Sequence, residues 1–166
     1  DITVGDKKVS EYFGKNFLRE VDEADFFADI KGAREACGDR AVLCAIHFFA
    51  DNKRAQDEAY ALEKGDFNKF LRLINESGDS SFKYLQNVFS SRFPQEQGLS
   101  LALALTEKFL NGSGACRVHG GGFAGTIQSF IKNEDVDAYV ELLDSVFGKG
   151  AVMPLFVRPL GAVRLF

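Results

Sequence analysis

The chain has 166 residues, of which 46% are hydrophobic and 27% are charged, with a formal net charge of −4 at pH 7. This length predicts about one domain, and a charged fraction near the globular average of about 25% excludes a chain that is disordered throughout. The 16 glycines follow no period and the prolines number only 3, which excludes collagen-like and low-complexity sequences. Because the balance is acidic and no basic run occurs, we expect no nucleic-acid partner.

The cysteines and the hydropathy of the sequence narrow the class of protein further. The sequence has 3 cysteines, Cys37, Cys44 and Cys116, an odd number whose spacing matches no zinc site. They lie in apolar or glycine-rich surroundings, so we expect reduced, structural thiols in a cytoplasmic protein with no metal site. No apolar run approaches the roughly 20 residues of a membrane-spanning helix, so no membrane partner is expected. The 17 phenylalanines, with no tryptophan, indicate core filling.

The first half of the chain predicts helices. Residues 1–20 are mixed and polar and are expected to form a connecting arm. Apolar residues at helical spacing predict one helix over 22–38 and a long helix over 39–64. Gly65 and Asp66 then form a stop-and-restart signal, because glycine suits a left-handed C-cap and aspartate suits an N-cap.

The middle of the chain continues in the same way. A third helix begins at Phe67 and is expected to break at the polar segment 77–81, after which helical spacing resumes over 82–89. Pro94 is expected in a first helical turn. Residues 99–110 predict a strongly buried helix.

The last third changes period after Gly114. The expected elements are strands at 115–119 and 126–131, a helix over 133–148 capped by Asn133, and closing strands at 151–157 and 162–166. Helices come first and strands late, which predicts an α+β domain with a mostly antiparallel sheet and helices packed on one face. We expect a single domain and a single core over 1–166.

Residues 120–125, Gly-Gly-Gly-Phe-Ala-Gly, are the segment that carries chemistry. They fit the G-x-G-x-x-G dinucleotide pattern, but that motif requires a helix after the loop, and TIQSFI is not helical. A protein-kinase loop would require V-A-I-K, H-R-D and D-F-G motifs, which are absent. Two interpretations remain. The loop is either a tight connection between strands, or a place where another backbone or an anionic ligand approaches bare N–H groups.

A family resemblance favours the second interpretation. The segment 114–125, GACRVHGGGFAG, resembles the third signature motif of the GHMP sugar kinases in its galactokinase form, G-A/S-R-M-T-G-G-G-F-G-G-C. Residues 65–77 resemble the family's G-D-Y/F…F-G-R-L-M…E-S-H segment, Ala45 and His47 its A-x-H, and residues 18–21 its L-R-E-V. This sequence departs from the family pattern with His119 for threonine, Ala124 for glycine and Gly78 for histidine. It also has one more residue between the Gly-Ala pair and Arg117 than some members, and a different sequence over 84–90 and 94–98.

The resemblance implies the ferredoxin-like C-terminal lobe of a two-lobe, ATP-dependent sugar kinase that phosphorylates galactose at C1. The family's R-x-N-L-x-G-E-H-x-D and G-L-S-S-S motifs, and its catalytic aspartate and arginine, do not occur in this sequence. The resemblance therefore implies that this sequence contains no catalytic residue and that the other lobe mainly binds ATP and Mg²⁺. It also implies little activity for this part alone.

By the same resemblance, the glycine loop closes the cleft for ATP and sugar. The candidate site residues are Gly120, Gly121, Gly122, Phe123, Gly125, Arg117 and His119. Arg117 either compensates charge near the phosphates or is a surface strand arginine, and His119 either contacts a ligand or simply ends the strand. We expect His47 to be structural, and residues 79–81 to form a helix-capping turn or to line the cleft.

Two other functions remain open. One is a non-catalytic relative that binds sugar and ATP and signals through a partner. The other is a stand-alone ligand-binding α+β module in which the glycine loop is an anion cradle. The sequence leaves the sugar and the oligomeric state open.

Overall fold

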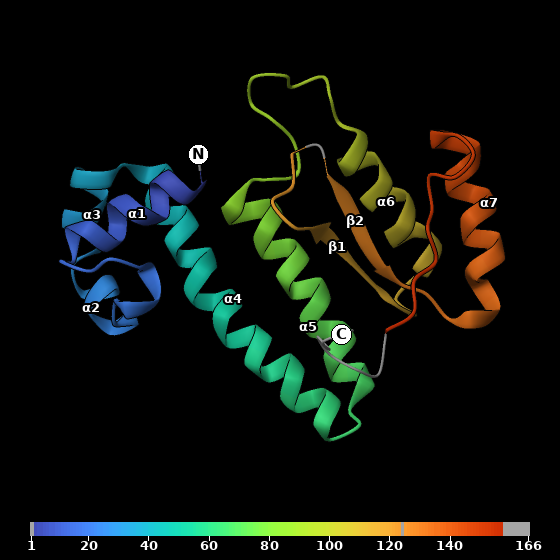
Figure 1. Cartoon of the computed structure of the whole chain (residues 1–166), viewed down its shortest axis with the longest axis horizontal. Helices are drawn as coiled ribbons and strands as arrows, with labels where there is room; N and C mark the ends of the chain where they lie inside the picture. Colours follow the sequence, from blue (N-terminus) through green and yellow to red (C-terminus); the bar gives the residue numbers. More distant parts are fainter. Residues whose placement is uncertain (1, 124, 158–166) are drawn as a thin grey trace, which may run out of the picture. The chain divides into compact units, whose positions relative to one another are not determined.

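A computed structural model describes residues 2–123 and 125–157 (Figure 1). Residues up to Phe130 form one compact unit, and the chain from Ile131 onward forms another. The expectation of one domain over 1–166 remains a prediction. In the described ranges, no helix is both long enough and apolar enough to cross a membrane.

The elements of the first unit are mostly helical. In chain order they are α1 (Ile2–Tyr12), a 3-10 turn (Leu18–Glu20), α2 (Glu23–Ala28), α3 (Ile30–Cys37), α4 (Asp39–Glu63), α5 (Phe67–Ser80), a π-helical turn (Ser81–Leu85), α6 (Gly98–Leu110), β1 (Ala115–His119) and β2 (Thr126–Phe130). The second unit contains a 3-10 turn (Asn133–Asp135) and α7 (Val136–Phe147).

The N-terminal segment differs from the expected arm and single helix. Residues 2–12 form α1, whose Val9 is completely buried. The helix expected over 22–38 is two helices, because Asp29 leaves helical geometry at φ −120° and ψ 37°. Its carboxylate then caps α3, accepting from the Gly32 N–H at 3.3 Å and from the Tyr12 hydroxyl at 2.6 Å.

Phenylalanine packing holds this part together. Phe26 is fully buried, and its ring centroid lies 6.1 Å from that of Phe13 and 5.2 Å from that of Phe49. In Figure 1, α1, α2 and α3 gather around the N-terminal half of α4. The expectation of core filling holds for Phe26 and Phe49 but not for the phenylalanines in general. Several in the described part of the chain are exposed, among them Phe17 at 66% and Phe93 at 64%.

Helices α4 and α5 lie side by side and are joined by a short turn (Figure 1). Gly65 in this turn has φ +69°, and the Asp66 side chain accepts from the Lys69 N–H at 3.0 Å. The long helix and the stop-and-restart signal are therefore confirmed.

Three expectations for the middle of the chain are wrong. The helical spacing expected over 82–89 gives only a π-helical turn that ends at Leu85, after which Gln86 is left-handed. The polar segment 77–81 does not break α5, which continues into the π-helical turn. Ser77, Ser80 and Ser81 are buried, so these polar residues face the interior rather than a solvated turn. Pro94 lies in a turn, and α6 begins only at Gly98, after which it ends at Leu110 as expected.

Strands β1 and β2 form an antiparallel hairpin, with Ala115 opposite Phe130 and His119 opposite Thr126. Strand β1 packs against α5 and α6. Ala115 is fully buried, and the Phe70 and Phe130 rings meet edge to face with centroids 5.2 Å apart. The strands expected at 115–119 and 126–131 are confirmed, the second one residue shorter.

In the second unit, α7 is confirmed and ends at Gly148, but its N-cap position is Asp135 rather than Asn133. The strand expected at 151–157 is wrong. The Asp144 carboxylate accepts from the N–H groups of Gly150 and Ala151, both at 3.0 Å, which ties the chain to the end of α7 instead of to a sheet. The strand expected at 162–166 lies outside the described residues.

The α+β class is confirmed, with one antiparallel hairpin as the sheet of the described residues. Packing of helices on a single face and a ferredoxin-like topology remain predictions. The glycine loop comes directly after β1, so the hairpin places this loop at its tip.

Candidate functional site

The glycine loop has an unusual backbone. Gly120 and Gly122 have φ angles of +65° and +73°, and the following Phe123, not a glycine, has +62°. Positive φ angles at these three positions suit a tight turn, and a turn can present successive N–H groups to an anion. Ala124 lies outside the described residues.

The loop approaches one other segment closely. The Phe123 N–H donates to the main-chain oxygen of Asn87 at 2.6 Å. A Cβ added at Gly122 would lie closer than 3.0 Å to that oxygen, whereas a Cβ at Gly120 or Gly121 would meet nothing within 4 Å. Within this loop, the close backbone approach therefore occurs at Gly122. Sequence reasoning missed Asn87 because it lies 35 residues earlier, in a loop with no motif.

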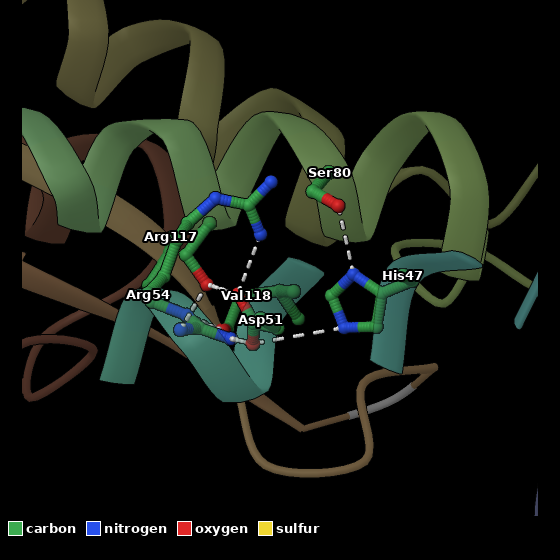
Figure 2. Close-up of polar contacts among 7 residues, drawn as sticks. His47, Asp51, Arg54, Ser80, Arg117 and Val118 are labelled. Atoms are coloured by element: carbon green, nitrogen blue, oxygen red, sulfur yellow. Dashed lines mark hydrogen bonds and ion pairs between the residues drawn. The ribbon is translucent and has the colours of Figure 1, made fainter. Parts of the chain in front are cut away.

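Arg117 lies in a polar network rather than on an open strand surface (Figure 2). Its Nη1 donates to Ser77 Oγ, its Nε donates to the Val118 carbonyl at 3.2 Å, and its Nη2 lies 3.8 Å from Asp51 Oδ2. Only 23% of the Arg117 side chain is exposed. The simple surface-arginine interpretation is therefore wrong, and charge compensation remains a prediction.

Asp51 is the centre of the network. Besides Arg117, it accepts from Ser77 Oγ and from Arg54 Nη1, the latter at 3.0 Å. His47, Asp51 and Arg54 stand at i, i+4 and i+7 on α4, so helical periodicity places them on one face. That spacing was the signal available in the sequence, but the partners on α5 and β1 were not predictable from it.

His47 is buried, as expected of a structural histidine. Its Nδ1 is hydrogen-bonded to Ser80 Oγ at 2.9 Å, and its Nε2 lies 3.7 Å from Asp51 Oδ2 (Figure 2). Burial lowers the pKa of His47, an effect that nearby Arg117 and Arg54 reinforce and that Asp51 opposes. The imidazole is therefore neutral at pH 7.

Asn75 joins α5 to β1. Its Nδ2 donates to the Gly114 carbonyl at 3.2 Å, and its Oδ1 accepts from the Cys116 N–H at 3.0 Å. A Cβ on Gly78, one turn further along α5, would lie 3.0 Å from the Cys116 carbonyl oxygen. The first residues of β1 are thus held tightly against α5, and the missing side chain at Gly78 permits this approach.

The remaining candidate site residues do not contact the polar network around Asp51. His119 is exposed at the end of β1, which leaves both of its interpretations open. A Cβ on Gly125 would lie 3.5 Å from the Gly122 carbonyl oxygen, an ordinary packing distance. Ser80, expected in a capping turn, instead holds His47.

The described side chains set limits on the chemistry. Among them, no group of three or more His, Cys, Asp or Glu residues could hold a metal ion. All three cysteines are free, and burial raises the pKa of Cys116 to about 12, so its thiol is a poor nucleophile. The groups that this site presents to a ligand are therefore mainly the backbone N–H groups of the glycine loop.

Comparison with curated proteins points to one family. The galactokinase of Glaesserella parasuis serovar 5 is 27% identical over 143 residues, covering 84% of this chain and 34% of that protein. This chain resembles the galactokinases. The galactokinases of Actinobacillus succinogenes and Haemophilus influenzae are each 26% identical, over 140 and 143 residues, covering 84% and 86% of this chain. No family model matches the chain.

The galactokinase resemblance expected from the motifs is therefore confirmed. The chain spans about a third of the length of these curated relatives, 34% and 35% in the cases above.

Proposed function

We propose that this chain is the C-terminal lobe of an ATP-dependent sugar kinase that phosphorylates galactose at C1. The observation that carries the proposal is its similarity to curated galactokinases over 84% of its length. The catalytic aspartate and arginine of the family would then lie in the part of the protein outside this sequence. This lobe alone would have little activity.

The glycine loop is the proposed contribution of this lobe to the cleft. Among the described residues, the N–H groups of Gly120 and Gly121 make no loop or turn hydrogen bond to a main-chain oxygen. Free amides at a left-handed turn suit a phosphate or a sugar oxygen, and phosphoryl transfer depends mainly on positioning and charge stabilisation. Phe123, Gly125 and His119 would shape the rim of the loop.

Arg117 has a different proposed role. Its guanidinium is committed to Asp51 and Ser77, so we expect it to hold β1, and through β1 the loop, more than to meet phosphate directly. By the family resemblance, Mg²⁺ would enter with ATP and be held mainly by the rest of the protein. The expected setting is the cytoplasm, where ATP is available and thiols stay reduced.

The decisive experiment uses the protein extended to its natural N-terminus. Coupled ADP release is measured with Mg–ATP and galactose, then with other hexoses. Galactose-dependent turnover supports the proposal. Turnover with another sugar only would keep the kinase and revise the substrate, with Gly78 and His119 as the first positions to test.

If no hexose gives ADP release, the enzymatic proposal is contradicted and a non-catalytic relative is favoured. A titration of ATP and galactose into residues 1–166 alone tests the remaining alternative. Tight binding to this part alone would favour a stand-alone module, because the proposed kinase needs both lobes for its cleft.

A further inference from the structure

The segment after α5 meets the glycine loop at a single main-chain oxygen. The Asn87 carbonyl accepts from the Phe123 N–H at 2.6 Å, and a Cβ at Gly122 would collide with the same oxygen. Gly122 is therefore required for contact as well as for its positive φ. The loop conformation and the position of Asn87 are coupled.

The identity of Asn87 is not explained by its own side-chain oxygen. The residue is 1% exposed, and its Oδ1 is buried with no hydrogen-bond partner in the described part of the chain. A buried amide oxygen without a partner is costly, and an aliphatic side chain of similar size would avoid that cost. The interaction that Asn87 does make with the loop is made by its main chain.

The backbone next to Asn87 is held by contacts that do not involve the glycine loop. The preceding Gln86 is left-handed, at φ +51°, and its N–H donates to the Ser81 carbonyl at 2.7 Å. The Gln86 side-chain oxygen accepts from Arg40 Nη1 on α4 at 3.0 Å. Gln86, the residue before Asn87, is thus tied to the π-helical turn and to α4.

We propose that Gln86 and Asn87 are positioning residues that set the glycine loop in its ligand-ready conformation. Their contact engages the Phe123 amide and leaves the amides of Gly120 and Gly121 for a bound anionic or hydroxyl oxygen. Donors fixed in advance require less reorganisation when the ligand binds. The ligand role rests on the proposed function above, whereas the anchoring contact does not.

Amide hydrogen exchange tests the anchor directly in the full-length protein. After correction for intrinsic rates, the Phe123 amide is expected to exchange about tenfold more slowly than the Gly121 amide. Gly122→Ala should abolish this protection because its Cβ meets the Asn87 oxygen. Gly121→Ala, whose Cβ meets nothing within 4 Å, is the matched control and should preserve it. Equal exchange of the Phe123 and Gly121 amides in the unaltered protein would overturn the anchor.

A remote variant tests the functional consequence. Arg40→Met removes the donor to Gln86, and we expect kcat/KM for ATP to fall about threefold to tenfold, with faster Phe123 exchange and an unchanged unfolding midpoint. Arg40→Lys keeps a donor and should restore most of the kcat/KM and most of the protection of the Phe123 amide. If Arg40→Met changes neither exchange nor kcat/KM, the positioning role is wrong. If the unaltered protein has no kinase activity, the proposed function fails while the exchange result still decides the anchor.

Discussion

The guanidinium of Arg117 on β1 and the carboxylate of Asp51 on α4 lie 3.8 Å apart, with 23% and 24% of their side chains exposed. The glycine loop follows Arg117 by three residues. A helix and a strand distant in sequence thus meet through one ion pair, shared with Ser77 and Arg54. The pair is shielded enough for loss of one partner to matter.

Asp51→Asn should lower the free energy of unfolding by about 1–3 kcal/mol. The substitution leaves Arg117 and Arg54 partly buried without a counter-charge, and partial exposure reduces the cost of a fully buried pair. Urea denaturation measures the change. Glu76→Gln, which removes an exposed pair with Arg72 at 3.6 Å, is the control and should cost less than about 0.5 kcal/mol. Equal losses in both variants would show that the network adds nothing.

His47 should make stability fall as the pH is lowered. Its folded pKa lies below the ordinary value of 6.5, so the unfolded chain binds the proton more readily. The stability contributed by neutral His47 is present above pH 6.5 and is lost as the pH falls below it.

Urea midpoints between about pH 7.5 and pH 5.5 test this in the unaltered protein and in His47→Gln. The unaltered protein should lose more stability over that range than the variant. Burial raises the pKa of Asp6 and Glu58, which act in the opposite direction, but both proteins share them. Parallel pH curves would exclude His47 as the source.

Gly114→Ala should destabilise the protein by about 1–3 kcal/mol, because overpacking forces backbone shifts. A Cβ at Gly114 would lie closer than 3.0 Å to the Phe130 carbonyl oxygen and to Leu110 Cδ2. Gly98→Ala is the matched control, since its Cβ would meet nothing within 4 Å and alanine favours a helix. A thermal melt that ranks Gly98→Ala below Gly114→Ala would contradict this packing.

Asp66→Ala should cost about 1 kcal/mol of unfolding free energy, because the side chain caps α5 through the Lys69 N–H at 3.0 Å. Asp66→Asn keeps an accepting oxygen and should retain most of that stability. Chemical denaturation distinguishes the two. A loss in Asp66→Asn as large as in Asp66→Ala would mean that the cap is not the cause.

Local chemistry was sufficient for much of this protein. The periodicity of α4, the turn at Gly65 and Asp66, both strands of the hairpin and the glycine loop were all predictable from the sequence. Each depends on residues within a few positions of one another, where helical spacing, caps and glycine act directly. The same holds for the galactokinase resemblance, which is carried by short motifs.

Only the tertiary structure decided the rest. The serines at 77, 80 and 81 are typical of a turn, yet they stay helical. Ser77 meets Asp51 and Arg117, and Ser80 meets His47. The buried Ser81 Oγ has no hydrogen-bond partner among the described residues. The expected strand at 151–157 is absent, and its first two amides, of Ala151 and Val152, donate to the Asp144 carboxylate. The contact of Gly122 with Asn87 likewise joins distant segments. Polar groups take whichever partner the packed chain brings within reach, and local patterns do not encode that partner.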